Sequence, residues 1–253
     1  MITAVINEKG GVGKTTTTAT LGHALSRLGQ RVLLVDLDPQ SNLTAWIGRR
    51  EEVPEATVAN ALADKAALPY AIGPSSAGEA MLAYGSRAVA DAADDLRASN
   101  PAPALALRRA LRGLDYDRII VDCPPGLGVL SVNALCAADE LIIPVNSQAM
   151  ALSGVAQLEA TIAELQDAEV ISRPPKAHLL LTMYDPRRVL AREVLEYLSS
   201  REGGHVYTTT IRASARIAEC YGQHQTIYDY AGHEGVADDY SRLAEEVLLV
   251  AAR

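Results

Sequence analysis

The sequence is poor in cysteine and in long apolar runs, and each scarcity excludes a class of protein. Its three cysteines (Cys123, Cys136 and Cys220) are an odd number without C-x-x-C spacing, which argues against a disulfide framework and against a zinc site. No run approaches the roughly 18 apolar residues of a membrane span, and the N-terminus lacks the pattern of a secretory signal. We therefore expect a soluble, cytoplasmic protein.

Positive charge is scarce as well. Over 253 residues, 23 basic side chains oppose 31 acidic ones, so the net charge is −8 and the chain as a whole is not a polycation built to coat nucleic acid. The hydrophobic share of 49% and the charged share of 21% are typical of globular proteins. Only four of the basic residues are lysines, and two of these, Lys9 and Lys14, lie within the first fourteen positions. That concentration argues against ordinary surface charge at Lys9 and Lys14.

Short apolar runs alternate with helical patterns along most of the chain. The predicted strands cover residues 2–6, 31–35, 118–121, 140–145 and 177–182, with a possible last strand at 205–209. Continuous apolar strands separated by helices are typical of a parallel sheet that is covered on both faces. We predict a doubly wound, mostly parallel α/β fold in a single domain over residues 1–253. The segment 73–103, rich in Ala, Ser, Gly and Pro, is expected to form inserted helices and loops.

The C-terminal pattern predicts a helix over residues 236–251 that packs on the core through one apolar face. We expect its opposite, solvent-facing side to carry Asp238, Asp239, Glu245 and Glu246 against Arg242. A helix that lies on a membrane surface needs basic residues on its polar face. The acidic side therefore argues against a membrane partner.

Residues 7–16 predict a phosphate-binding loop between the first strand and a helix from about Lys14 to Gly29. Glycines let backbone N–H groups turn toward phosphates, and the helix N-terminus adds the positive end of its dipole. Lys14 would reach the β- and γ-phosphates of ATP, and the Thr15 hydroxyl would ligate Mg²⁺. The strict motif G-x-x-x-x-G-K-[ST] fails because Glu8 occupies its first position. The sequence matches the deviant form K-G-G-x-G-K-T-T instead, which has an extra lysine at position 9.

Acidic residues follow two of the predicted strands. Asp36 and Asp38 come after the second strand, and Asp122 comes after the third. An Asp at the carboxyl end of a parallel strand lies on the edge where α/β folds bind ligands. Asp122 suits the Mg²⁺ partner of a nucleoside triphosphatase. Asp36 and Asp38 could each simply cap a strand end, but beside a P-loop at least one should hold the metal or the attacking water.

Several longer motifs carry a resemblance to a known family. They are K-G-G-V-G-K-T-T at 9–16, V-D-L-D-P-Q-S-N-L-T at 35–44, V-D-C-P-P-G-L-G at 121–128, V-N-A-L-C-A-A-D-E-L-I-I-P-V at 132–145, A-L-S-G at 151–154 and L-T-M-Y-D-P-R at 181–187. Together they resemble the ParA/Soj family of deviant-Walker ATPases, whose relatives include MinD and the nitrogenase iron protein. The longer plasmid ParA proteins carry an N-terminal helix-turn-helix that is absent here, so specific operator binding is not expected.

The resemblance implies an ATP- and Mg²⁺-dependent dimer switch for chromosome or plasmid partition. Catalysis would involve Lys9, which reaches across the dimer to the second nucleotide, together with Lys14 and with Asp38, which positions the attacking water. The metal would be held by Thr15, Asp38 and Asp122, and the nucleotide by Lys9, Gly10, Gly11, Val12, Gly13, Lys14, Thr15, Thr16 and Asp122. The family also implies non-specific binding of double-stranded DNA, slow hydrolysis stimulated by a ParB-type centromere-binding protein, and a place on the nucleoid.

The negative net charge is unevenly spread, which allows an acidic chain to bind DNA. Residues 173–216 carry eight basic and four acidic side chains, a balance of +4 that leaves −12 for the rest. Arginines on one face, doubled in a dimer, would give salt-sensitive, sequence-independent binding, although they could also be solvated charges paired with glutamates. Arg216 aligns with the arginine of the family motif V-R-L-S-E and is the first DNA-binding candidate, followed by Arg187 and Arg212.

Alternative functions differ in the features that they require. A MinD-like membrane ATPase needs a basic amphipathic tail, which this sequence lacks. An iron–sulfur reductase needs two cluster cysteines, whereas Cys123 belongs to the family's D-C-P-P motif and Cys136 resembles a small buried helix residue. A ParA-like ATPase that positions a protein assembly or a membrane-associated cargo instead of DNA stays open, because surfaces rather than motifs select the cargo.

Overall fold

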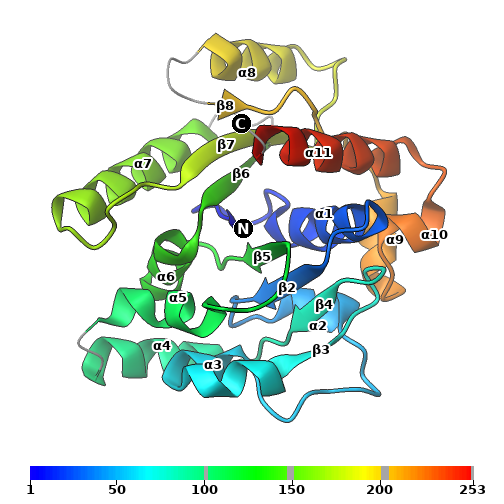
Figure 1. The fold of residues 1–253 in the computed structure, drawn as a ribbon. Helices are drawn as coiled ribbons and strands as arrows, with labels where there is room; N and C mark the ends of the chain where they lie inside the picture. Colours follow the sequence, from blue (N-terminus) through cyan, green and yellow to red (C-terminus); the bar gives the residue numbers. More distant parts are fainter. Residues whose placement is uncertain (100–101, 147–150, 201–204, 252–253) are drawn as a thin grey trace.

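An eight-stranded sheet forms the centre of the computed structural model, which describes residues 1–99, 102–146, 151–200 and 205–251 (Figure 1). The strands, in their order across the sheet, are β3 (Ile72–Pro74), β4 (Met81–Ala83), β2 (Val32–Asp36), β5 (Arg118–Asp122), β1 (Ile2–Val5), β6 (Glu140–Asn146), β7 (Lys176–Thr182) and β8 (His205–Val206). Neighbouring strands are parallel except β3 and β4. The predicted doubly wound, mostly parallel fold is confirmed.

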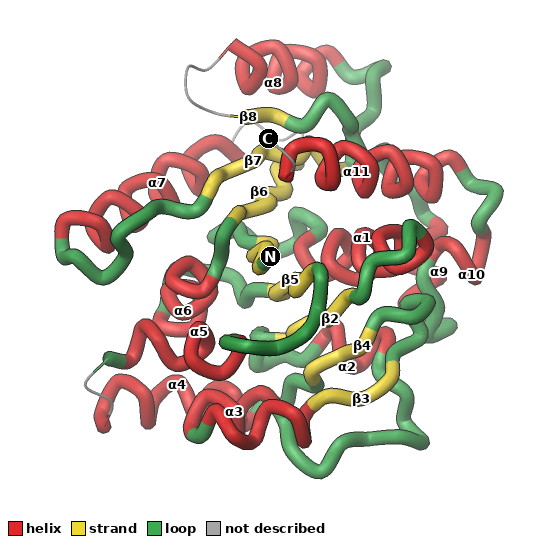
Figure 2. The backbone as a smooth tube through the Cα atoms, in the orientation of Figure 1, coloured by secondary structure: helices red, strands yellow, loops and turns green. Residues whose placement is uncertain are grey.

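Helices cover both faces of this sheet (Figure 2). One face is covered by α1 (Lys14–Arg27), α2 (Asn42–Ile47), α9 (Arg216–Gly222), α10 (Ile227–Ala231) and α11 (Gly235–Ala251). The other is covered by α3 (Val58–Ala63), α4 (Ala88–Ser99), α5 (Ala106–Leu111), α6 (Val129–Ala137) and α7 (Ala151–Asp167), and α8 (Val189–Ser200) adds Val194 to the same core. Two 3₁₀ helices, at Lys65–Ala71 and Pro103–Leu105, complete the described helical elements.

Burial on both faces explains the continuous apolar strands. In β2, Leu33 and Val35 pack in the core beneath α3 to α6, and Leu34 between them packs in the core beneath α1 and α11. All three side chains are fully buried. Because side chains alternate between the faces of a strand, a sheet covered on both sides requires apolar residues at consecutive positions.

The expectation for residues 73–103 is wrong in one respect, because this segment contributes strand residues as well as a helix. Strand β4 extends the parallel sheet beside β2, and β3 returns antiparallel to β4. The Tyr84 hydroxyl donates to the Pro74 carbonyl over 2.7 Å and so ties the end of β3 to the residue that follows β4. Each strand has only three residues, which is too short to produce a periodic signal in the sequence.

The expectation for the outer side of the C-terminal helix also needs correction. Tyr240, Leu243 and Val247 of α11 are buried as predicted. Asp239, however, is only 2% exposed, and the Glu246 carboxylate accepts hydrogen bonds from the backbone N–H groups of residues 208 and 209. The segment after β8 crosses this side of α11, a neighbour that helical periodicity does not reveal. None of the helices that the structure describes has the length and hydrophobicity of a membrane span.

The packing of α1 on β2 yields a test of the fold. A Cβ atom at Gly22 would lie 2.5 Å from Leu34 Cδ2, so this glycine allows the helix to approach the sheet closely. Gly22→Val should lower the free energy of unfolding by about 1–3 kcal/mol through overpacking, measured by urea denaturation. The matched change Gly222→Val enters open space and should stay within about 0.5 kcal/mol of the wild type. Equal losses in the two variants would refute this explanation.

Candidate functional site

The loop between β1 and α1 has the backbone of an anion-binding site. Gly11 and Gly13 adopt left-handed conformations, with φ of 72° and 92°, which side chains other than glycine adopt with strain. A Cβ atom at Gly10, Gly11 or Gly13 would have no heavy atom within 4 Å, so the loop borders open space. Helix α1 begins directly after it at Lys14, which brings the positive end of the helix to this space.

Lys14 lies against this loop with its ammonium group almost enclosed. Its Nζ donates to the carbonyl oxygens of Asn7 and Lys9 over 3.0 and 2.7 Å, and the residue is 7% exposed. Burial lowers the pKa of Lys14, and the nearby Asp122 carboxylate opposes that shift. The positive charge is therefore held inside the phosphate-binding loop by backbone carbonyls and by an acidic neighbour.

Two polar residues that sequence reasoning missed anchor the loop to the sheet. The Asn7 side chain donates to the Pro144 carbonyl in β6 over 2.8 Å and accepts from the Lys9 backbone N–H over 3.0 Å. The Thr182 hydroxyl, at the end of β7, donates to the Val12 carbonyl over 2.9 Å. The available signal was a polar residue at the end of an apolar strand in each case. Because both residues are buried, their hydrogen bonds hold the loop in place.

Carboxylates meet at the ends of β2 and β5, on the same sheet edge as the loop. Asp36 and Asp122 are paired in register, and both are completely buried. Burial and the adjacent Asp36 carboxylate raise the pKa of Asp122 well above its usual value, whereas the Thr15 hydroxyl lowers it. Asp122 Oδ2 has no hydrogen-bond partner among the described residues. Two neighbouring buried carboxyl groups, one with a free oxygen, make this a place that a cation would stabilise.

The two acidic residues after β2 have different surroundings. Asp36 accepts hydrogen bonds from the backbone N–H groups of Thr44 and Asp38 over 2.8 and 3.3 Å, so it caps the turn that leads into α2. Burial raises the pKa of Asp36 to about 6. Asp38 accepts one bond, from the Gln40 backbone N–H over 2.9 Å, and is 7% exposed. Both carboxylates therefore accept backbone N–H groups, and Asp36 is the more completely buried of the two.

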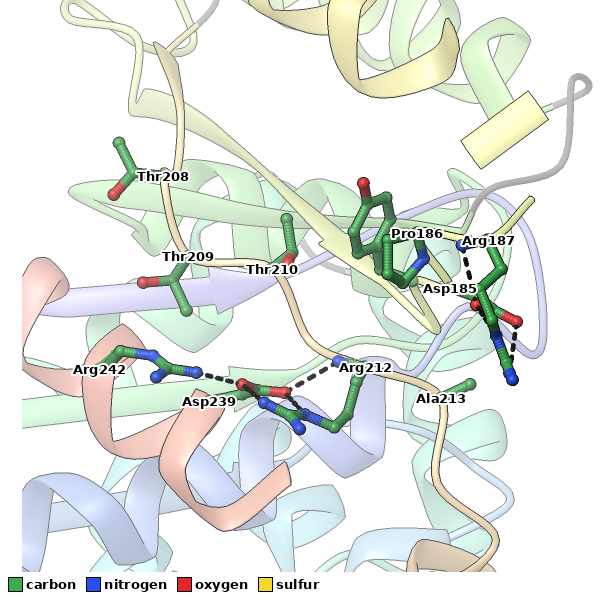
Figure 3. Close-up of a pocket in the computed structure, with 11 residues that line it drawn as sticks. Asp185, Pro186, Arg187, Thr208, Thr209, Thr210, Arg212, Ala213, Asp239 and Arg242 are labelled. Atoms are coloured by element: carbon green, nitrogen blue, oxygen red, sulfur yellow. Dashed lines mark hydrogen bonds and ion pairs between the residues drawn. The ribbon is translucent and has the colours of Figure 1, made fainter. Parts of the chain in front are cut away.

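Two of the three DNA-binding candidates line a pocket of about 710 Å³ between the segment after β7, the segment after β8 and α11 (Figure 3). Arg212 forms an ion pair with the buried Asp239 at 2.7 Å, and Arg242 binds the same carboxylate. Burial would raise the pKa of Asp239, but the bonds from Arg212 outweigh it and leave the pKa below its usual value. Arg187 turns to Asp185 instead, at 2.9 Å. Arg187 and Arg212 therefore share one pocket, but each is paired with its own carboxylate.

Arg216, the third candidate, is the first residue of α9 and does not line this pocket. Its guanidinium lies 2.7 Å from a Glu219 carboxylate oxygen and 3.7 Å from one of Glu234. The Arg216 side chain is 50% exposed, so solvent reaches both ion pairs. The structure thus leaves the predicted arginines accessible and pairs each of them with acidic neighbours.

Comparisons with known proteins agree with this geometry. Residues 1–173 match the family described as AAA domain. The chain is 39% identical over 248 residues to the chromosome-partitioning ATPase Soj of Thermus thermophilus, covering 97% of this chain and 94% of that protein. Soj of Bacillus subtilis, a sporulation initiation inhibitor protein, is 36% identical, with 97% of each chain covered.

A solved structure is similar over the same extent. It is a Mycobacterium smegmatis protein described as cobyrinic acid a,c-diamide synthase, solved with an ATP analogue and magnesium. Its TM-score is 0.80 at 33% identity, covering 98% of this chain and 93% of that one. A deviant P-loop followed by strand-end carboxylates, on a sheet shared with these proteins, is the arrangement of a P-loop ATPase. On this evidence the chain belongs to the Soj/ParA family of partition ATPases.

Proposed function

We propose that this ATPase segregates chromosomal or plasmid DNA as a nucleotide-dependent homodimer. The ATP-bound dimer binds double-stranded DNA without sequence preference, and a ParB-type centromere-binding protein stimulates slow hydrolysis and releases it. The protein would act in the cytoplasm, on the nucleoid. The observation that carries this proposal is the phosphate-binding loop with two lysines, in a chain that resembles a chromosome-partitioning ATPase over 97% of its length.

The residues at the sheet edge fit ATP and Mg²⁺, which are also bound in similar solved proteins in the form of an ATP analogue and magnesium. Oxygen ligands suit Mg²⁺, and Thr15, Asp38 and Asp122 supply a hydroxyl and two carboxylates. The free Oδ2 of Asp122 supports this assignment. The backbone from Lys9 to Thr16 would surround the phosphates, and Lys14 would exchange its carbonyl partners for phosphate oxygens. Bound Mg²⁺ would neutralise phosphate charge.

Hydrolysis requires positive charge on the γ-phosphate and a positioned water molecule. Lys9 suits the first task, because its ammonium has no ion pair within the described ranges while its backbone N–H is fixed by Asn7. We assign Lys9 to the phosphates bound by a second copy of the chain, so that dimerisation completes the site. Asp38, which is buried at the same edge of the sheet, would hold the attacking water.

DNA binding would use the arginines near the C-terminal half, doubled by dimerisation. Arg216 and Arg187 are exposed and could exchange an acidic neighbour for a phosphate with little desolvation. Arg212 would contribute at its exposed side while it stays bound to Asp239. A cargo other than DNA would leave nucleotide binding and dimerisation intact and remove the need for these arginines.

Nucleotide binding should depend on Lys14. Lys14→Ala removes the buried ammonium, and the loss of one charged hydrogen bond, roughly 2 kcal/mol, should weaken binding of a fluorescent ATP analogue about thirtyfold. Lys65→Ala removes an exposed lysine outside the loop and should bind the analogue like the wild type. Unchanged affinity in Lys14→Ala would remove Lys14 from the phosphate site.

Dimerisation should depend on Lys9. With a non-hydrolysable ATP analogue and Mg²⁺, we expect the wild type to sediment as a dimer and Lys9→Ala to sediment as a monomer, because repulsion between phosphates is no longer offset. Lys9→Ala should still bind the analogue. A dimer of unchanged stability in Lys9→Ala would end the proposed role across the interface.

DNA binding should depend on Arg216 and on the nucleotide. Binding to random-sequence duplex DNA, measured over a salt series, should be tight only with the ATP analogue. Arg216→Glu should weaken it and reduce the slope of log affinity against log salt by about two per dimer, because each copy loses a phosphate contact. The control is Arg87→Glu, which reverses the charge of an exposed arginine immediately before α4. If the wild type bound nucleotide but not DNA, the cargo would be a protein or a membrane.

A further inference from the structure

A second cavity, of about 860 Å³, opens at the sheet edge opposite the phosphate-binding loop. It lies where strands begin: Ile2 opens β1, Lys176 opens β7, and Asp139 precedes β6. The phosphate-binding loop follows the other end of β1. The cavity is therefore separate from the nucleotide site proposed above.

Basic side chains from two different segments meet around this cavity. They are Arg108, Arg109 and Arg112 at the end of α5, and Arg173 and Lys176 from the connection between α7 and β7. Asp139 is the one acidic residue in the lining, so the five basic residues leave a balance of +4 on a chain with a net charge of −8. All five basic residues are exposed. The lining thus has a charge opposite to that of the whole protein.

These cations lack partners in the part of the chain that the structure describes, where none of them forms an ion pair or a side-chain hydrogen bond. Asp139 is the one carboxylate of the lining, and its Oδ2 accepts a hydrogen bond from the Ile2 backbone N–H over 2.7 Å, so it offsets only one of the five positive charges. By contrast, Arg187, Arg212 and Arg216 all pair with carboxylates. Five cations without an ion pair in the described residues therefore surround this one cavity.

An apolar floor narrows the choice of ligand. Leu135, Cys136 and Ile171 line the cavity and are at most 5% exposed, and Leu105 is partly buried beside them. A DNA duplex would offer phosphates to the basic residues, but it has no apolar side chain that could pack against this floor. Basic residues at the C-terminus of a helix can also serve to offset its dipole, which would account for Arg108 and Arg109. That explanation does not cover Arg173 and Lys176, which approach from another segment.

We propose that this basic cavity is a docking site for an acidic segment of a partner protein, with Asp or Glu residues flanking an apolar side chain. The acidic residues would pair with the unpartnered arginines, and the apolar side chain would cover the floor. Complementary charge would speed the encounter and select against basic segments. Because the cavity lies across the sheet from the phosphate-binding loop, docking is compatible with bound nucleotide.

The experiment measures fluorescence anisotropy of a labelled twelve-residue peptide of repeated Glu-Glu-Leu. A Lys-Lys-Leu peptide and a labelled DNA duplex are compared with it, each in ADP and in an ATP analogue. The full chain carries its affinity tag at the carboxyl end, because Met1 lines the cavity. The test variant combines Arg108→Glu with Arg173→Glu. The control combines Arg87→Glu with Arg192→Glu, which reverses the same charge at exposed positions outside the cavity.

We expect the wild type to bind the acidic peptide and not the basic one. The dissociation constant should rise about tenfold in the test variant, equivalent to roughly 1.4 kcal/mol, and less than about twofold in the control. Unchanged binding of the ATP analogue would show that the test variant is folded.

Three results would overturn the proposal: no saturable binding of the acidic peptide to the wild type, equal weakening in both variants, or no weakening in either. If the test variant lost DNA binding but kept peptide binding, the cavity would belong to a nucleic-acid surface instead. Failure of the partition proposal would give a different result: the wild type would bind the acidic peptide but would not bind DNA in any nucleotide state.

Discussion

The edge of the sheet at the carboxyl ends of its strands is organised around two buried carboxyl groups. Asp36 and Asp122 lie side by side at the ends of β2 and β5, and burial raises the pKa of both. Backbone N–H groups satisfy Asp36, but an oxygen of Asp122 has no partner within the described ranges. Lys14 is the basic neighbour that acts on Asp122, and its own pKa is lowered by burial. Two adjacent buried carboxyl groups favour the binding of a cation, and the metal ion of a bound nucleotide would supply one.

The scaffold keeps these groups in place through hydrogen bonds at the ends of strands. Asn7 and Thr182 connect the phosphate-binding loop to β6 and β7, and Gly22 allows α1 to lie close to β2. The loop itself has left-handed glycines and borders open space. A fixed frame around an open loop is what phosphoryl transfer requires, because positioning supplies most of its catalysis.

Two groups of exposed arginines differ in whether they have a carboxylate partner. Those predicted for DNA binding pair with carboxylates, and Arg212 in particular stabilises the buried Asp239. Those around the opposite cavity are unpaired within the described ranges. Exposed ion pairs contribute little to stability and exchange readily, so pairing does not prevent Arg216 from meeting a phosphate. The basic residues around the opposite cavity, however, have no such partner to release, so an acidic ligand would bind most favourably there.

Sequence alone determined the fold class, the phosphate-binding loop and the family, because each depends on contiguous residues. A run such as 32–36 must be apolar throughout when both faces of its strand are buried, and Lys9 and Lys14 belong to one short motif. The short strands β3 and β4 were not predicted, because three residues are too few to show the alternation of a strand. Only the tertiary structure decided the rest. Asp239 was expected to face solvent, but the segment after β8 lies across α11 and Arg212 of that segment binds it. Arg108 and Arg173 lie 65 positions apart in the chain yet line one cavity. Pairing of charges is a through-space property, set by which segments the fold brings together.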